Sequence, residues 1–410
     1  ITIDSANGTY YMKDNQLYEK TDYGDEIATF FAALDANKTL TVPNGVVTLP
    51  RYVLSAYTGV RKVILPESVK TVDSYAFESC YDLETVEMPA VEEIGLRAFH
   101  YCHNLKYIKL PRTLKAMGNG AFYECSALAE GGLTVDMSEV DGENVKIGDY
   151  VFNVGSSFTV NGKKAVPGVK KVILPGNIKE IPEEMFSGCE NLEWVTYYTD
   201  KVDPDGNKLL AGADKGNGVY LPEGVTDINS EAFADCIKIT YAEIPASVTV
   251  LGSNVLQGCT ALQEVKFLGE GITEIASFAF KDCTSLVKVN VPSTVTAIKQ
   301  SAFSGCVELS NVGLLANVTE VYERAFLNCA KFKGMDTSAV TYFGTSAFSG
   351  SGITEAVINS NMVSMTVGYM TYYVGSTFAN CTELTKVTFG PDVTQLCSSM
   401  FKGCTKLTSI

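Results

Sequence analysis

The amino-acid sequence predicts a repeat solenoid that is mainly β, and three observations support this fold class. A repeat position that is usually phenylalanine recurs at a nearly constant spacing. Counted from Phe233, the successive steps are 23 (to Leu256), 24, 23, 23, 22, 30 and 23 residues. Short apolar stretches with a period of two precede this slot. Eight of the 13 prolines follow directly after those stretches. Such self-similarity is typical of stacked repeats, in which neighbouring units bury one continuous core.

Each unit contains three elements in a fixed order. The first is a short strand such as 83–88, which Pro89 ends because proline has no N–H to donate to a sheet. The segment 91–94 is expected to return along the other side of the coil, and 98–102 then closes it as a 3₁₀ or single-turn helix. Stacked in this way, about 14 units should form a curved parallel sheet on the concave side, with the short strands and helical turns opposite.

The register divides the chain into a cap and a solenoid. We expect residues 1–37 to form an N-terminal hairpin cap and 38–410 to form the solenoid, with β-hairpin insertions near 129–165 and 197–218, where dipeptides such as Asp205-Gly206 indicate tight turns. The step of 47 residues from Phe186 to Phe233 hides one degenerate unit. Because the sequence stops inside a strand without a polar cap, the native chain is expected to continue beyond residue 410.

Charge and hydropathy exclude some partners. The chain has 47 acidic and 32 basic residues, a formal net charge of −15, and no cluster of Lys and Arg. We therefore expect no nucleic-acid partner. No apolar run approaches the length of about 18 residues that a membrane-spanning helix requires.

Eleven of the twelve cysteines occupy one repeat slot, three residues after the phenylalanine slot, and only Cys397 stands apart. Equivalent side chains in stacked units point in parallel directions, whereas a disulfide requires converging Cβ vectors. The favoured interpretation is a column of reduced, buried thiols. Disulfides and a metal array are the alternatives, although the sequence contains no Cys-x-x-Cys pair.

Catalytic and metal-binding patterns are weak. The only histidines, His100 and His103, flank Cys102 and are expected on the surface of a turn, with a zinc site as the alternative. The residues Asp200 to Asn207 lack the spacing of a helical calcium loop. We find no catalytic triad or phosphate-binding loop, so we expect no enzyme, no cofactor and no metal, although paired carboxylates of a glycosidase need no motif.

The outward-facing strand positions are the predicted ligand site, because solenoids commonly bind partners on the concave sheet. Aromatic residues gather there on neighbouring strands, and Trp194 is the only tryptophan. Exposed Trp and Tyr are typical of binding hot spots and also stack on sugar rings. The alternative is that they pack under the hairpin at 197–218. The candidate ligand-binding residues are Trp194, Tyr220, Tyr241, Tyr107 and Glu243.

The unit from Leu83 to Cys102, repeated over about residues 38–410, resembles the BspA-like leucine-rich repeats of bacterial surface antigens. The slot that holds Asn or Cys in commoner leucine-rich repeats is usually Val here, so no asparagine ladder is expected. The resemblance implies a secreted or cell-surface bacterial protein, and some members of the family are adhesins. We expect a non-catalytic interaction module that binds a host or microbial protein or glycan. A structural spacer or surface antigen is the alternative, and a glycan-active enzyme is a third.

Overall fold

The computed structural model describes residues 34–125, 132–153, 168–313, 315–361 and 375–408, together with the backbone of seven strands outside these ranges. Its described residues form 34 strands and no helix, and the solenoid has about 12 turns. The chain divides into two compact units. The first unit contains residues 1–178 and 184–213, and the second contains 179–183 and 214–410.

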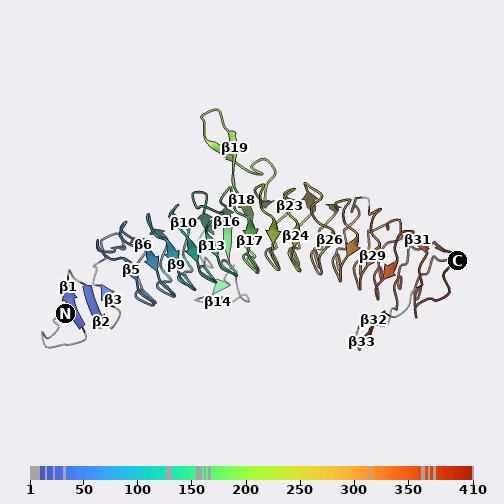
Figure 1. Ribbon diagram of the computed structural model, residues 1–410, viewed down its shortest axis with the longest axis horizontal. Helices are drawn as coiled ribbons and strands as arrows, with labels where there is room; N and C mark the ends of the chain where they lie inside the picture. Colours follow the sequence, from blue (N-terminus) through green and yellow to red (C-terminus); the bar gives the residue numbers. More distant parts are fainter. Residues whose placement is uncertain are drawn as a thin grey trace. The chain divides into compact units, whose positions relative to one another are not determined.

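In the first unit, long and short parallel strands alternate along the chain from β4 to β13 (Figure 1). The long strands form one sheet in the order β4 (Thr39–Thr41), β6 (Lys62–Ile64), β8 (Thr85–Glu87), β10 (Tyr107–Lys109), β12 (Leu133–Asp136), β16 (Val169–Ile173) and β18 (Trp194–Thr196). The short return strands form a second sheet in the order β5 (Thr48–Leu49), β7 (Thr71–Val72), β9 (Glu93–Ile94), β11 (Ala116–Met117) and β13 (Lys146–Ile147).

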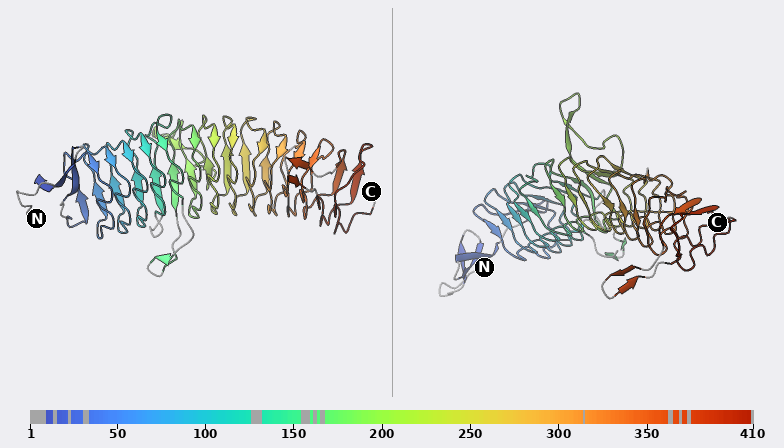
Figure 2. Two further views of the ribbon diagram at one scale, coloured as in Figure 1. Left: turned by 60° about the horizontal axis from the view of Figure 1, so that its bottom comes forward. Right: turned by 45° about the vertical axis from the view of Figure 1, so that its right-hand side comes forward.

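The second unit repeats this two-sheet pattern (Figure 2). Its long strands are β21 (Gly218–Tyr220), β23 (Tyr241–Ile244), β25 (Glu264–Phe267) and β27 (Lys288–Asn290), followed by the pair β31 (Glu355–Ile358) and β34 (Lys386–Phe389). Its return strands are β17 (Glu180–Ile181), β22 (Asp227–Ile228) and β24 (Val250–Leu251), then β26 (Glu274–Ile275), β28 (Ala297–Ile298), β29 (Glu320–Val321) and β30 (Tyr342–Phe343). Because β17 pairs directly with β22, the degenerate unit at β18 has no return strand. This missing strand is one reason why the turns are fewer than the expected 14 units.

Antiparallel segments occur at four places, one of them before the first strand of the stack. Two of them, β14–β15 and β19–β20, lie within the ranges 129–165 and 197–218 where hairpins are predicted, and the pair at 365–372 has no sequence prediction. The segments are β1 (Tyr10–Lys13) with β2 (Gln16–Thr21) and β3 (Gly24–Phe30), β14 (Thr159–Val160) with β15 (Lys163–Lys164), β19 (Tyr198–Val202) with β20 (Lys208–Leu210), and β32 (Met365–Val367) with β33 (Met370–Tyr372).

A column of phenylalanine rings forms the centre of each unit, which we call the phenylalanine column. Phe77 and Phe99 stack with ring centroids 4.9 Å apart, and Phe303 and Phe326 with centroids 5.3 Å apart. These rings are fully buried, as is Leu256, which fills the same slot in its coil. Inward residues of both sheets surround the column, so that each coil buries an apolar face that it could not bury alone.

The turns that carry these rings are not the 3₁₀ or single-turn helices that the sequence predicts. In the coil of Phe77, the residues two before and two after it, Tyr75 and Ser79, have left-handed φ values of 60° and 59°. A 3₁₀ helix requires consecutive right-handed residues, so these reversals prevent it. They instead turn the N–H groups of Phe77 and Ser79 toward the next coil, where each makes a hydrogen bond of 2.8 Å to a backbone carbonyl.

The cysteine slot adds a second bond between coils. The Cys306 thiol donates a hydrogen bond of 3.0 Å to the backbone carbonyl of Phe280, one coil earlier. The thiol-to-carbonyl distance for this slot lies between 2.9 and 3.3 Å in ten coils. All twelve cysteines are free, and all except Cys397 and Cys404 are buried. Burial raises the pKa of the Cys189 thiol to about 12, so the thiol stays protonated and can donate.

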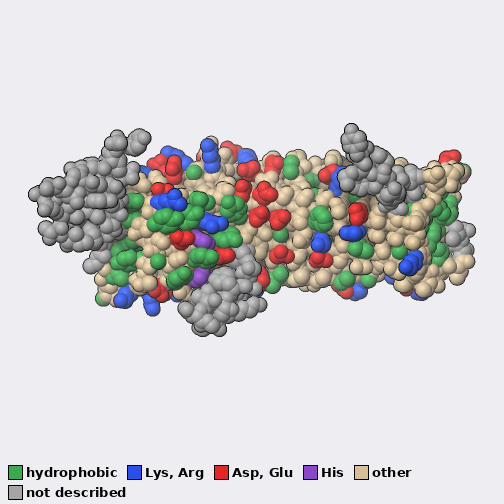
Figure 3. Space-filling view, turned by 90° about the horizontal axis from the view of Figure 1, so that it is seen from below, with side chains coloured by type: hydrophobic (Ala, Val, Ile, Leu, Met, Phe, Trp, Pro, Cys, Tyr) green, Lys and Arg blue, Asp and Glu red, His purple; other side chains and the backbone are tan. Residues whose placement is uncertain are grey.

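The two histidines are buried, contrary to the expectation that they lie on the turn surface. His100 and His103 are 5% and 4% exposed. Both lie among aromatic rings: the His100 centroid is 3.7 Å from that of Tyr101, and the His103 centroid is 5.2 Å from that of Tyr81. Figure 3 shows hydrophobic side chains gathered around the histidines. The left-handed turn folds bulky neighbouring side chains over positions that a helical turn would expose.

Substitution within the phenylalanine column tests the packing. We expect Phe303→Ala to lower the free energy of unfolding by about 3–5 kcal/mol, because it leaves a cavity between two stacked rings. Phe303→Leu should cost about 1.5 kcal/mol or less, since Leu256 fills the same slot natively. Urea denaturation of the whole chain measures both changes. Equal losses in the free energy of unfolding for the two variants would contradict the proposal that this slot fills the core of each coil.

Burial of His103 predicts a pH dependence of stability. Burial lowers the pKa of the His103 imidazole to about 4, so the unfolded chain takes up this proton first as the pH falls. The stability that the neutral, buried His103 contributes is therefore fully present above about pH 6.5 and is lost between about pH 6.5 and pH 4. We expect the free energy of unfolding of the wild type to fall by about 2–3 kcal/mol more than that of His103→Leu between about pH 8 and pH 4.5. Urea curves at both pH values test this, and identical losses in the two proteins would refute it.

Candidate functional site

Parallel strands in register place outward side chains in two rows on the long-strand sheet, a surface that we call the strand face. In the second unit the first row holds Tyr241, Glu264 and Lys288 on successive strands. The second row runs Tyr220, Glu243, Lys266 and Asn290. Because adjacent strands lie about 4.8 Å apart, side chains within a row can contact one another directly.

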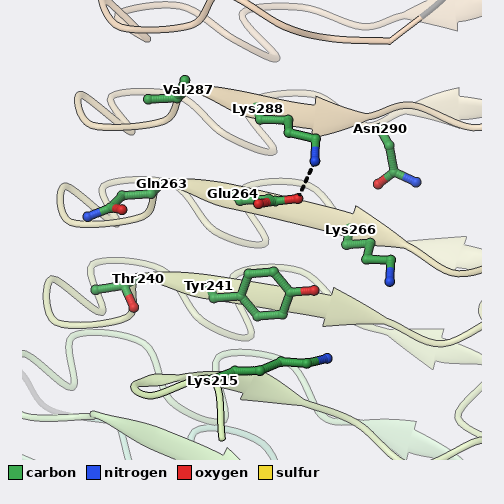
Figure 4. Close-up of a pocket in the computed structure, with 9 residues that line it drawn as sticks. All are labelled: Lys215, Thr240, Tyr241, Gln263, Glu264, Lys266, Val287, Lys288 and Asn290. Carbon is green, nitrogen blue, oxygen red and sulfur yellow. Dashed lines mark hydrogen bonds and ion pairs between the residues drawn. The ribbon is translucent and has the colours of Figure 1, made fainter. Parts of the chain in front are cut away.

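A pocket of about 860 Å³ opens on this face across β23, β25 and β27 (Figure 4). Side chains from both rows and from the residues that precede the strands line it. They are Lys215, Thr240, Tyr241, Gln263, Glu264, Lys266, Val287, Lys288 and Asn290. Its volume lies in the range of ligand sites.

Ion pairs and hydrogen bonds order most of the polar side chains in and beside the pocket. Lys288 Nζ lies 2.7 Å from Glu264 Oε1, and Lys215 Nζ lies 2.7 Å from Glu243 Oε2. The Tyr241 hydroxyl donates a bond of 2.9 Å to the same Glu243 oxygen. Burial acts to raise the pKa of Glu243, but the bonds from Lys215 and Tyr241 outweigh it and hold this pKa below its ordinary value.

Two further residues complete the frame. The Asn290 amide makes two bonds of 2.8 Å to the backbone N–H and carbonyl of Phe267, which fixes its orientation. Lys266 has no ion-pair partner among the described residues. Lys266 lies opposite Glu243 on the next strand, and its charge helps to lower the pKa of that carboxyl. The pocket therefore combines an aromatic ring, a fixed polar frame and one ammonium group that forms no direct ion pair.

The structure brings together three of the five predicted site residues: Tyr220, Tyr241 and Glu243. Tyr220, however, is only 2% exposed, so it does not offer the open ring that the prediction requires. Its hydroxyl donates a bond of 3.2 Å to the Gly216 carbonyl, and Lys215 Nζ lies 5.8 Å from its ring centroid. The C-terminal part of the predicted hairpin range 197–218 thus contacts Tyr220, as in the alternative that the aromatic residues pack under this segment.

The other two predicted residues, Trp194 and Tyr107, lie in the first unit. Trp194 is half-buried, its Nε1 makes no hydrogen bond, and Lys171 Nζ lies 4.7 Å from its ring centroid. Burial lowers the pKa of Lys171. Tyr107 is 44% exposed, and β12 and β16 separate its strand from that of Trp194. Within the first unit, Trp194 and Tyr107 are therefore not on neighbouring strands.

Glu264, Lys266, Lys288 and Asn290 occupy outward-facing strand positions, which the sequence predicts as the ligand site, but the repeat pattern does not indicate that these four residues line one pocket. The pattern misses Lys215 altogether, because this residue lies outside the repeat register and no period locates it. A second pocket of about 670 Å³ on β6, β8 and β10 includes Tyr107, with Lys62 and Lys109 at its edge.

Among the residues that the structure describes, no three His, Cys, Asp or Glu side chains lie close enough together to hold a metal ion. No helix there is long and apolar enough to cross a membrane.

The comparisons with known proteins agree on the fold. Six copies of the BspA type leucine rich repeat region match residues 28–159, 164–269, 261–369 and 368–410. A leucine-rich repeat protein from Bacteroides ovatus is 22% identical over 97% of this chain and 93% of its own, with a TM-score of 0.59. A leucine rich cell surface protein from Faecalibacterium prausnitzii is 20% identical over 82% and 95%, with a TM-score of 0.34. The pneumococcal vaccine antigen PcpA is 16% identical over 93% of both chains, with a TM-score of 0.41.

No curated protein matches the chain. The family match covers most of its length, and the Bacteroides ovatus structure shares its fold. The chain belongs to the BspA-type leucine-rich-repeat family.

Proposed function

We propose that this protein is a non-catalytic interaction module of a bacterial cell surface that binds a protein or a glycan through the pocket on the strand face of its second unit. The observation that supports this most directly is that Lys266, which forms no direct ion pair among the described residues, lines the same pocket as the Tyr241 ring and a frame of ordered polar side chains. An ordered site loses little conformational freedom on binding, which favours affinity.

The chemistry of the pocket suits a polar ligand. The Tyr241 ring can stack on a sugar ring or an apolar side chain, and the ion pair of Glu264 with Lys288 offers both donors and acceptors. Lys266 favours a ligand with a negative group near that ring. A binding site in a repeat protein of this family fits the general role of such solenoids in recognition.

The same contacts argue against the enzyme alternative. A glycosidase requires two carboxyl groups, one of them protonated to act as the general acid. Glu243 and Glu264 are each held in an ion pair with a lysine, and the pKa of Glu243 is lowered rather than raised. This arrangement suits neither a general acid nor a free nucleophile, so it supports a binding function.

Surface location is part of the proposal. It is supported by membership of a family named for bacterial surface proteins, and by the description of the Faecalibacterium prausnitzii relative as a cell surface protein. Adhesion to host or microbial molecules is the finer form of the proposal. A spacer or displayed antigen without its own ligand is the alternative that the following experiment addresses.

Substitution in the pocket should weaken binding. We expect Lys266→Ala and Tyr241→Ala each to reduce affinity at least tenfold, about 1.4 kcal/mol, in a panel of host matrix proteins and glycans. Lys386→Ala, an exposed lysine on β34 of the same unit, is the matched control and should bind like the wild type. Circular dichroism checks that each variant is folded. Equal binding by all variants would place recognition elsewhere, and no binding by the wild type would favour the spacer.

A further inference from the structure

A second surface lies on the turns of the first unit, where tyrosine and arginine side chains surround the phenylalanine column. We call it the turn face. Its side chains come from the slots just before and after the column residue in consecutive coils. They are Arg51, Tyr52, Tyr75, Arg97, Tyr101 and Tyr123.

These side chains contact one another from coil to coil. The rings of Tyr52 and Tyr75 stack with centroids 5.1 Å apart, and the Arg51 guanidinium lies 4.9 Å and 5.2 Å from the two centroids. Farther along, the Arg97 guanidinium lies 5.2 Å from the centroid of Tyr123. Tyr52 remains 46% exposed. The result is two ordered groups of aromatic rings and guanidinium groups on consecutive coils, which we together call the strip.

The backbone under this strip is strained by the residues that it carries. Tyr52, Tyr75 and Tyr101 have φ values of 61°, 60° and 62°. In this left-handed region a bulky L-residue costs about 1–2 kcal/mol more than glycine, and asparagine is also tolerated there. The turn geometry therefore gives no reason for tyrosine at these slots.

The second unit shows that the repeat itself does not require these aromatics. Its turns adopt the same geometry with small or polar residues in the same two slots, and Phe278 is the one aromatic there. The residues in these slots of the second unit are Glu231, Asp235, Asn254, Gly258, Phe278, Asp282, Ser301, Gly305, Arg324, Asn328, Ser346, Gly350, Ser376, Asn380, Ser399 and Gly403. Strained side chains that the fold does not need are typical of functional sites.

The charge of the strip indicates the kind of partner. Neither Arg51 nor Arg97 has a carboxylate within 4.0 Å among the described residues, although the chain carries a net charge of −15. Most ion pairs of this solenoid join a lysine to a glutamate, frequently one coil away, as Lys106 joins Glu84. The two guanidinium groups are therefore available to bind carboxylates from another molecule, which they can do with two parallel hydrogen bonds.

We propose that the turn face of the first unit docks a protein partner through a segment that combines carboxylates with apolar or aromatic side chains. Tyr and Arg are the residues most enriched in the energetic centres of protein interfaces. A protein suits the strip better than a glycan does. Tyr52 and Tyr75 use one ring face on each other, and the Tyr52 hydroxyl accepts a bond of 3.3 Å from Arg51 Nη2, so ring edges and the other guanidinium N–H groups remain to be bound. This site is independent of the strand-face pocket.

The test uses a displayed library of random peptides of about twelve residues, panned against the whole chain. Two double variants alter the strip in different ways. Tyr52→Ser with Tyr75→Asn replaces the rings with residue types that occupy the same slots in the second unit. Arg51→Gln with Arg97→Gln removes the positive charges. The matched control is Phe278→Ser with Arg324→Gln, the equivalent slots in the second unit. Urea midpoints are measured for every protein.

We expect the wild type and the control to enrich acidic peptides with apolar side chains, and both turn-face variants to bind these peptides at least tenfold more weakly. The urea midpoints of the turn-face variants should be no lower than that of the wild type, because the fold does not need these side chains and the replacements for tyrosine do not add backbone strain. Peptides without acidic residues, equal binding by the variants, or no enrichment would overturn the proposal. A lower midpoint for the tyrosine variant would assign the rings to packing. Turn-face-dependent binding in a glycan array, without peptide binding, would assign the site to glycans.

Discussion

The backbone carbonyl of the phenylalanine slot is the point on which each coil depends. The Phe303 carbonyl accepts the Cys306 N–H of its own turn at 3.1 Å and the Cys329 thiol of the next coil at 3.0 Å. The N–H of Phe303 donates to the Ala325 carbonyl of that next coil at 2.8 Å. One residue thus closes its own turn, binds the following turn and places its ring in the column. Buried backbone groups that make such bonds avoid a desolvation cost of several kcal/mol.

This division of roles leaves the outward positions free to vary. Because inward slots carry the packing and the turn hydrogen bonds use backbone atoms, side chains on the strand face and the turn face can change without loss of the coil. The two units use that freedom differently. The second gathers Tyr241 and Lys266 in a pocket on its strands, whereas the first gathers tyrosine and arginine on its turns. A solenoid built in this way can present more than one recognition surface.

The inward residues could be predicted from sequence because their spacing records the stacking directly. Phe77 to Phe401, the cysteine slot and the alternation of the strands all follow from one period. The turns could not be predicted, since a left-handed φ at Tyr75 or Tyr101 leaves no periodic signal when the residue is not glycine. The same error explains why His100 and His103 were expected on the turn surface, although both are buried. Tyr220 was misplaced because its cover comes from Lys215 and Gly216, outside the repeat.

Native-state hydrogen exchange of backbone amides tests most directly whether these turn bonds hold the coils together. We expect the backbone amides of Phe99, Phe303 and Phe326, which donate to the next coil, to exchange among the slowest in the chain. The amides of the β19–β20 hairpin, whose side chains are mostly exposed, should exchange at least a hundredfold faster, a difference of about 2.7 kcal/mol. Equal exchange in the two places would contradict the claim that the phenylalanine slot organises the fold.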